Sequence, residues 1–425
     1  MKNICFYFQL HQPYGLKRYR FFEIGNDHYY YDDFQTEENI RSLAEKTYIP
    51  ANQTLLECIH HSNKQFKCAF SISGSTLEQL EQYAPEVIDS FRELADTGCV
   101  EFLVEPYAHS LASIYNDVEF ERQVNLQAKK IEELFGYKPT ALRNSALIYS
   151  DEIGEKAWKM GYKTMLIEGG RHVLGWKSPH YVYHHAEQKN LNILIRDYKL
   201  SDDISFRFSD KSWTDYPLTA DKYMQWIASF PEEEQIINIW LGYEAFGSLQ
   251  DASTGIFDFL KALPYQAMVN GIEFTTPSQA VHKLAAQEAV HIPNPIAWAS
   301  EEKDLSIWTG NALQQEALSK LYAVTERVRL CKQNALKRDW LHIQSSDYFR
   351  YMSYKSTYDS PYESPYEAFV NYMNILSDFL LRVEAEYPSS IDNEELNALL
   401  KTITEQENEL SDLHKQIHVL QTKKK

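Results

Sequence analysis

Hydrophobic and polar positions follow two different periods along roughly the first two thirds of the chain. Seven short runs rich in β-branched and aromatic residues have the length of buried strands: "NICFYFQ", "QFKCAFSIS", "CVEFLV", "TALRNSALIY", "KTMLIEG", "LNILIRD" and "IINIWLGYE". Amphipathic stretches with helical spacing separate most of them, such as "EFERQVNLQAKKIEELFG". Strands that alternate with helices predict an α/β fold, an incomplete parallel (β/α)7 barrel over residues 1–285, with a doubly wound sheet as the alternative.

The pattern becomes purely helical after the predicted barrel. The stretches "EEKDLSIWTGNALQQEALSKLYAVTERVRLCKQNAL" and "SPYEAFVNYMNILSDFLLRVEAEY" keep a helical period. They predict a helical domain over residues 286–387 that packs on the barrel and completes a cleft.

The last segment, residues 388–425, has a third pattern. Its core positions recur at alternating spacings of three and four, with one polar member: Leu396, Leu399, Ile403, Gln406, Leu410, Leu413, Ile417 and Leu420. Such heptads predict a coiled-coil tail, through which the chain forms a homo-oligomer or binds another protein. A single amphipathic helix docked on its own domain is the alternative.

Charge and composition narrow the range of partners. The chain has 42 basic and 60 acidic residues and a formal net charge of -18, which repels nucleic-acid phosphates and anionic lipids. Its apolar runs are shorter than the roughly 18 residues of a membrane span. The five cysteines are scattered and lack CxxC spacing, so they suit a reducing compartment. We therefore expect a cytoplasmic protein with no nucleic-acid or membrane partner, and no cofactor or metal.

Aromatic residues are abundant, at 29 Tyr, 21 Phe and 8 Trp. Flat rings with polar tips suit the faces of sugars, but they also suit ordinary packing. The composition therefore permits a carbohydrate ligand without requiring one.

Candidate chemistry is expected where strands end, because the reacting groups of a parallel barrel lie at its carboxyl-terminal face. His11 and Gln12 follow the first strand, and Glu105 and His109 follow the third. Glu244 follows the seventh. The sequence thus predicts a polar cluster at the mouth of the barrel.

Six ordered motifs extend over residues 3–385: "HQP", "VEFLVEPYAHSL", "RNSALIYSDEIG", "GYEAFGSLQDASTGIFDFLKALP", "WASEEKDLSIWTGNALQQEAL" and "SSDYFRYM". Together they resemble glycoside hydrolase family 57, the retaining α-glucan hydrolases and transferases, and most closely its α-amylase-type members. The resemblance implies that an α-1,4-glucan is bound by a set of polar and aromatic residues: His11, Gln12, Glu105, His109, Trp176, Glu244, Trp298, Trp308 and Asp347.

The same resemblance implies that both catalytic carboxylates are absent. A retaining glycosidase needs a nucleophile and an acid/base about 5–5.5 Å apart. The family's nucleophilic glutamate falls on Ala146 and its acid/base aspartate on Gly242. An alanine cannot attack carbon and a glycine cannot donate a proton, so we expect a pseudoenzyme that binds glucan. The alternatives are a weakly active hydrolase or transferase with replacement carboxylates, and a scaffold with an empty cleft.

Overall fold

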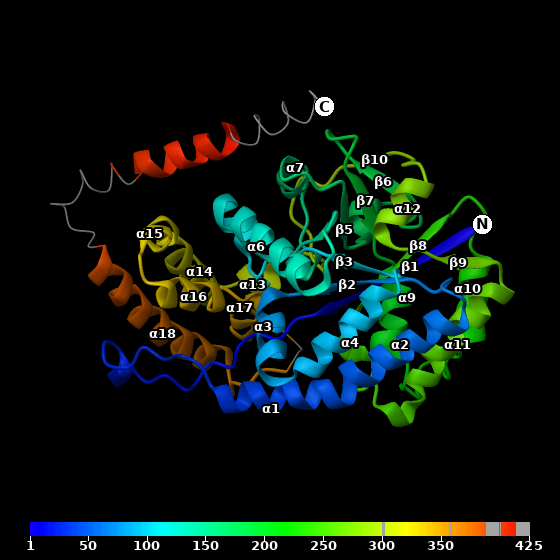
Figure 1. Ribbon diagram of the computed structural model, residues 1–425, viewed down its shortest axis with the longest axis horizontal. Helices are drawn as coiled ribbons and strands as arrows, with labels where there is room; N and C mark the ends of the chain where they lie inside the picture. The colour runs from blue at the N-terminus through cyan, green and yellow to red at the C-terminus, as the bar shows by residue number, and fades with distance from the viewer. Residues whose placement is uncertain (300–301, 357–358, 388–398, 400, 414–425) are drawn as a thin grey trace.

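The seven predicted strands all form in the computed structural model, which describes residues 1–299, 302–356, 359–387, 399 and 401–413 (Figure 1). They are β1 (Lys2–Leu10), β2 (Cys68–Ile72), β3 (Val100–Leu103), β4 (Ala141–Arg143), β5 (Thr164–Ile167), β7 (Asn192–Ile195) and β8 (Ile236–Gly242). Each is parallel to its neighbours in two groups, β3-β2-β1-β8 and β4-β5-β7.

Two isolated parallel bridges close these groups into a ring. Val104 pairs with Leu142 next to β3 and β4, and Arg196 pairs with Asn238 next to β7 and β8. The predicted (β/α)7 barrel is therefore confirmed against the doubly wound alternative. We call the two closure lines the β3–β4 seam and the β7–β8 seam.

Three short strands were not predicted. The antiparallel β6 (Val182–His185) pairs with β7, β10 (Ala289–Val290) extends from β6, and β9 (Ile272–Phe274) pairs with the start of β1. Their two to four residues are too few for an alternating pattern to be recognised, and β6 ends on two histidines.

Helices surround the barrel and then form a separate group. The first set is α1 (Asp33–Leu43), α2 (Ile49–His61), α3 (Gly74–Tyr83), α4 (Pro85–Asp96), α5 (Ala112–Tyr115), α6 (Asp117–Phe135), α7 (Asp151–Lys159), α8 (Arg171–Leu174), α9 (Tyr198–Asp202), α10 (Ala220–Ser229), α11 (Ile256–Val269) and α12 (Pro277–Lys283). The second is α13 (Ser306–Thr309), α14 (Ala312–Ala323), α15 (Thr325–Leu330), α16 (Asn334–His342), α17 (Ser346–Tyr351) and α18 (Pro365–Glu386). Figure 1 shows the second set gathered at one end of the barrel. The boundaries at 285 and 387 stay a prediction.

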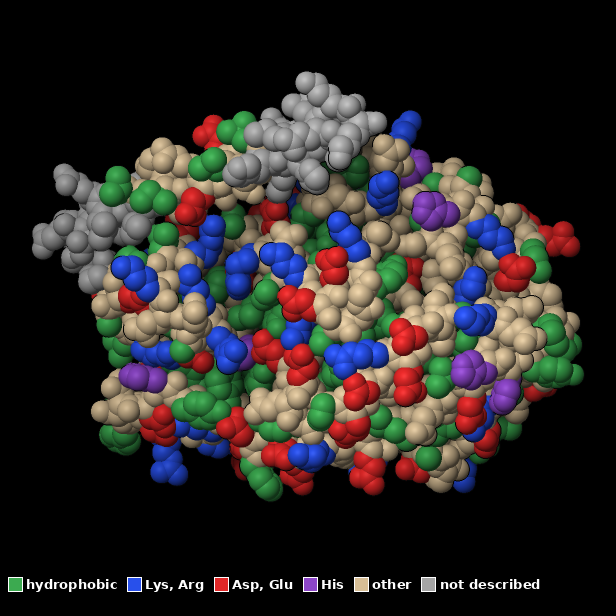
Figure 2. Space-filling view, viewed as in Figure 1, with side chains coloured by type: hydrophobic (Ala, Val, Ile, Leu, Met, Phe, Trp, Pro, Cys, Tyr) green, Lys and Arg blue, Asp and Glu red, His purple; other side chains and the backbone are tan. Residues whose placement is uncertain are grey.

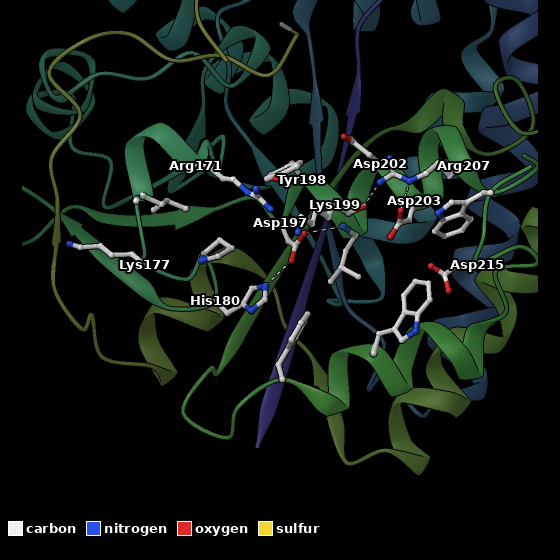
Figure 3. A pocket seen from close by; sticks show the side chains of 18 residues that line it. Arg171, Lys177, His180, Asp197, Tyr198, Lys199, Asp202, Asp203, Arg207 and Asp215 are labelled. Atoms are coloured by element: carbon white, nitrogen blue, oxygen red, sulfur yellow. Dashed lines mark hydrogen bonds and ion pairs between the residues drawn. The ribbon is translucent and has the colours of Figure 1, made fainter. Parts of the chain in front are cut away.

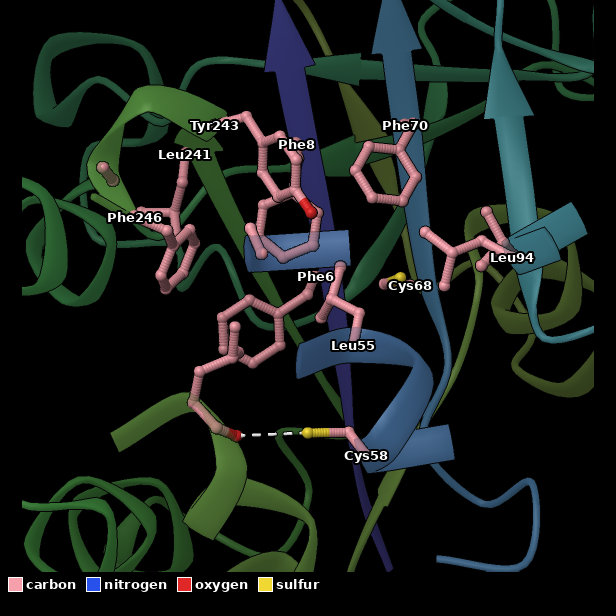
Figure 4. Close-up of a cluster of buried hydrophobic side chains, with 14 of the residues drawn as sticks. Phe6, Phe8, Leu55, Cys58, Cys68, Phe70, Leu94, Leu241, Tyr243 and Phe246 are labelled. Atoms are coloured by element: carbon pink, nitrogen blue, oxygen red, sulfur yellow. Dashed lines mark hydrogen bonds between the residues drawn. The ribbon is translucent and has the colours of Figure 1, made fainter. Parts of the chain in front are cut away.

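Alternate residues of β1 belong to two different cores, as the pleat of a strand requires. Phe6 and Phe8 point outward into a cluster with Phe70 and Tyr243 that packs against α2 and α4 (Figure 4). Tyr7 points into the barrel, where most of its neighbours are small or branched side chains. Aromatic residues therefore join the barrel to its helices, which explains much of their abundance.

The surface and the tail bear on possible partners. Acidic and basic side chains are interspersed over the face shown in Figure 2. Within the described part of the chain, no helix is long and apolar enough to cross a membrane.

Residues 399 and 401–413 are helical, and the predicted core positions there are exposed: Leu399, Ile403, Gln406, Leu410 and Leu413. Leu396, Ile417 and Leu420 lie outside the described residues, so the coiled coil stays a prediction.

Candidate functional site

One cavity of about 680 Å³ collects nearly all the predicted site residues at the carboxyl-terminal ends of the barrel strands. Its lining includes His11, Gln12, His109, Ala146, Gly242, Glu244, Trp298, Trp308 and Asp347. Glu105 is completely buried beneath it, and Trp176 lies elsewhere. The fold thus brings together His11, which follows the first strand, and Asp347, which belongs to the helical region.

Ala146 lies in a left-handed turn directly after β4. Its φ and ψ are 50° and 28°, and Leu147 follows with φ 55°. This conformation costs an L-residue about 1–2 kcal/mol, so two consecutive examples need support from their surroundings. Part of that support is a hydrogen bond from the Trp298 N–H to the Ala146 carbonyl, at 3.2 Å. The turn places a buried methyl group, with no acid–base capacity, in the cavity wall.

Gly242 ends β8, and the carboxyl group of Glu244 occupies space next to it. A Cβ atom at position 242 would lie 3.3 Å from Glu244 Oε2. The other oxygen, Oε1, accepts hydrogen bonds from Gln12 Nε2 and the Tyr48 hydroxyl, both at 3.1 Å. Burial raises the pKa of Glu244, and these hydrogen bonds only partly oppose the rise. A carboxyl group with an increased tendency to stay protonated therefore lies beside position 242.

His11 and His109 stack in the cavity wall with ring centroids 4.2 Å apart. His11 Nδ1 lies 2.7 Å from Ser73 Oγ, and its Nε2 lies 2.9 Å from Asp347 Oδ2. His109 Nδ1 lies 2.6 Å from Glu105 Oε2. Burial and the neighbouring His11 lower the pKa of His109 to about 4, so its imidazole is neutral near pH 7.

Glu105 holds His109 from below. It also pairs with Arg143 Nη2 at 2.9 Å and accepts a hydrogen bond from Ser71 at 2.8 Å. Burial opposes ionisation of Glu105, but Arg143 and His109 outweigh burial and lower its pKa to about 2. With no exposed surface, Glu105 orients His109 instead of reaching into the cavity.

The helical region supplies the wall of the cavity opposite the strand ends. Asp347, in the first turn of α17, pairs with Arg350 Nη2 at 2.8 Å as well as with His11. The N–H of Ser346 donates to the His109 carbonyl at 3.1 Å. Burial disfavours the charge of Asp347, but the His11 hydrogen bond and Arg350 hold its pKa well below the usual value. Asp347 thus lines the same cavity as His11.

Several lining residues were missed by the sequence analysis. They are Gln9, Asn39, Ser42, Leu43, Arg196, Ser205, Phe206, Trp240, Ser346, Arg350 and Asp359. Arg196 directly follows β7, so applying the strand-end rule to every strand would have found it. Its guanidinium pairs with Glu168 at 3.0 Å and lies over the Trp240 ring, 5.0 Å from the centroid. Phe206, 46% exposed, comes from the segment after α9 and carries no comparable signal.

Trp176 lies apart from this cavity. Its side chain is 90% exposed. Its neighbours Gly175 and Lys177 line a second, larger groove (Figure 3). Among the described residues, no group of three or more His, Cys, Asp or Glu side chains could hold a metal ion. All five cysteines are buried and free.

Acid should destabilise the protein as the pH falls from about 6.5. His109 has a folded pKa of about 4, below the value near 6.5 of an ordinary histidine, so the unfolded chain binds the proton first. Stability is therefore lost as the pH falls from about 6.5 to about 4. Glu105, with a folded pKa of about 2, causes a further loss of stability below about pH 4.5.

Urea unfolding at about pH 7, 5 and 3 checks this expectation through the transition midpoint. The variant His109→Asn should lose less stability between about pH 6.5 and 4 than the unmodified protein. Asparagine is a suitable replacement because it tolerates the left-handed backbone at position 109, where φ is 53°. A midpoint that stays constant from about pH 7 to 4 would contradict the role given to His109.

Comparisons with known proteins agree with this geometry. The model of glycosyl hydrolase family 57 matches residues 5–293. A protein of Methanocaldococcus jannaschii named "Putative alpha-amylase" is 36% identical over 397 residues, which cover 88% of this chain and 84% of the relative.

Solved structures show the same fold at low sequence identity. A glycoside hydrolase family 57 branching enzyme from Thermococcus kodakaraensis aligns with a TM-score of 0.67 and 13% identity, covering 91% of this chain and 94% of the other. A branching enzyme of the same type from Pyrococcus horikoshii gives a TM-score of 0.65 and 15% identity over 96% and 95% of the two chains. At these identities the structures establish the fold alone.

Proposed function

This chain belongs to glycosyl hydrolase family 57 and is α-amylase-like, and from this premise we propose that it binds α-1,4-glucan without hydrolysing it. The observation that carries the proposal is the pair Ala146 and Gly242, which line one cavity at the ends of β4 and β8. The retaining mechanism needs a carboxylate at each of two facing positions. Neither residue supplies one, so double displacement by the family route is blocked at both steps.

Retained binding is supported by what remains in the cavity. His11, His109 and Gln12 line the cavity. Their polar groups already have protein partners, which are Ser73 and Asp347 for His11, Glu105 and Gln9 for His109, and Glu244 for Gln12, so a sugar hydroxyl binds by joining or displacing these contacts. Trp298 and Phe206 provide ring surface. Hydroxyl contacts and ring packing do not depend on the missing carboxylates, so binding can persist where catalysis is lost.

Maltooligosaccharides should bind saturably, and Phe206→Ala should weaken their binding. Removing one exposed ring contact should cost roughly 0.5–1.5 kcal/mol of binding free energy, which raises the Kd about two- to tenfold. Titration calorimetry with maltotriose and longer oligomers measures the change. His11→Ala and His109→Ala should also weaken binding. Phe22→Ala, which removes an 85% exposed ring outside the cavity lining, is the matched control. No interaction with any α-glucan would favour the scaffold with an empty cleft.

A second candidate function is weak hydrolase or transferase activity with a replacement acid. Glu244 favours it, because its Oε2 lies 3.3 Å from the Cβ position of residue 242 and burial raises its pKa. A raised pKa suits a general acid near neutral pH. Release of reducing sugar that disappears in Glu244→Gln would support this alternative over the pseudoenzyme.

The tail is proposed to join copies of the chain or to bind a partner protein. Exposed Leu399, Ile403, Leu410 and Leu413 on the described helix support this role, because heptad positions are buried by a second helix. Deletion of residues 389–425 should lower the number of copies per particle, calculated from the molar mass measured by light scattering. An unchanged number of copies would reject self-association. A cytoplasmic location stays a prediction.

A further inference from the structure

A groove of about 1150 Å³ lies outside the cavity described above, between α8 and the segment that follows it on one side and α9 and α10 on the other (Figure 3). His180 and Asp197 lie at its centre, with Lys177 and Asp215 on opposite sides. We propose that this groove is a second carbohydrate-binding site, which holds a neutral α-glucan chain. The choice of α-glucan rests on the proposed function of the first cavity.

Two half-buried tryptophans form part of its wall. Trp213 and Trp226 stand edge to face, with centroids 6.1 Å apart and planes at 79°. Arg207 lies over the Trp213 ring at 5.8 Å and Lys222 over the Trp226 ring at 5.4 Å. These contacts fix the orientation of both rings, so their remaining surface is preorganised for a flat apolar ligand face.

Trp176 follows α8 and lies in sequence between two residues that line the groove, but its own ring is not part of the lining. It follows Gly175, whose φ is 60°, and precedes Lys177, and both neighbours line the groove. An indole that is 90% exposed leaves a large apolar surface in water without any packing benefit.

The charges that line the groove are largely neutralised in pairs. Asp197 lies 2.8 Å from His180 Nε2, and Asp203 lies 2.5 Å from Arg207 Nε. The other pairs, at 2.5–3.7 Å, are His180–Glu234, Arg196–Asp202, Lys177–Glu288 and Lys222–Asp215. Paired ions keep unused lone pairs and N–H groups but exert little net field. This combination suits a neutral ligand with many hydroxyl groups better than an ion.

The groove and the first cavity are neighbours at the same end of the barrel. Arg196 lines the cavity, and its ion-pair partner Asp202 lines the groove. A long glucan can therefore contact both sites, whereas a short one fits either alone. Linked sites raise the apparent affinity for the long chain through effective concentration.

The test compares short and long ligands on the full-length protein. Trp213→Ala combined with Trp226→Ala should leave one of two maltotriose sites in calorimetry. The same double variant should weaken retention in glycogen-containing gels by roughly tenfold or more, the change expected when about 1.4 kcal/mol of contact is lost. Phe206→Ala should weaken binding at the other maltotriose site, in the first cavity. Phe22→Ala is the control, and thermal unfolding verifies that each variant folds.

The possible outcomes separate the two proposals. A single maltotriose site that depends on Phe206 and ignores both tryptophans would overturn the second site and leave the first intact. A single site that depends on the tryptophans alone would support the groove and reject binding in the cavity. Arg171 and Lys199 are exposed cations in the groove lining, so an anionic polysaccharide is the competing class of ligand. Binding only to an anionic polysaccharide such as heparin, lost in Arg171→Ala with Lys199→Ala, would also overturn the neutral-glucan assignment.

Discussion

The double variant Ala146→Glu with Gly242→Asp should hydrolyse an activated aryl α-maltooligosaccharide, whereas each single variant should remain close to background. A nucleophile without an acid, or an acid without a nucleophile, completes only half of the displacement, so the effects are expected to be strongly non-additive. The double variant should exceed either single variant by about 10²-fold, since positioned proton transfer contributes roughly 10²–10⁴. Initial rates of phenol release measure the difference.

The structure supports this expectation and also defines its main obstacle. Position 146 lies in the cavity wall, so a longer side chain there would begin at the cavity. A Cβ at position 242, in contrast, comes within 3.3 Å of Glu244 Oε2, so that side chain must move aside. Adding Glu244→Gln removes the repulsion between two neighbouring carboxylates and should raise the rate further if that repulsion limits it.

The matched control is Ala146→Gln with Gly242→Asp, which preserves the size of the new side chain but not its ability to attack carbon. Equal rates in this control and in the glutamate variant would show that position 146 is not the nucleophile position. Vigorous hydrolysis by the unmodified protein that survives Glu244→Gln would contradict the placement of the active site altogether.

Glu105→Gln should lower the free energy of unfolding by about 3–5 kcal/mol, the usual result of removing one partner from a buried ion pair. Arg143 has no exposed surface, and its Nη1 already lacks a hydrogen-bond partner in the described part of the chain. Without the carboxylate, the guanidinium charge stays buried with only neutral partners. Urea unfolding followed by circular dichroism gives the difference.

The same substitution at an exposed pair provides the comparison. Glu316 and Lys320 form an i,i+4 ion pair at 2.9 Å on the surface of α14. Glu316→Gln should change stability by less than about 0.5 kcal/mol, because solvent screens exposed pairs. A similar small effect of Glu105→Gln would mean that Arg143 reaches water or another anion when Glu105 is neutralised.

The strands of the barrel could be predicted from the sequence because their signal is local. A strand buried on both faces reads as a continuous apolar run, and β1, β2 and β8 all have this form. The short β6, β9 and β10 add to sheets that other strands have already formed, so nothing in their own residues identifies them.

The site could be predicted less completely, because its contacts are not local. The strand-end rule places His11 and His109 on one face but cannot tell that Glu105 lies beneath His109, since that depends on the burial of Arg143 beside it. Asp347 came from the family resemblance alone. Its contact with His11 depends on how the helical region docks, which no residue pattern specifies. The resemblance implied both Trp176 and Trp298 as glucan-binding residues, yet only Trp298 lines the cavity.

The two seams of the barrel determine how its mouth can deform. At each seam a single bridge takes the place of a full hydrogen-bonded ladder. The barrel therefore resembles two stiff half-cylinders, one of β3, β2, β1 and β8 and the other of β4, β5 and β7, that are joined flexibly along the two seams. Arg143 and Glu105 form a buried ion pair across the β3–β4 seam. At the β7–β8 seam, Arg196 from the end of β7 lies over the Trp240 ring of β8, 5.0 Å from the centroid. His109 follows β3 in one half-cylinder, Arg196 follows β7 in the other, and both line the same cavity. A sugar held between them would act as a strut, stiffening the whole barrel against bending.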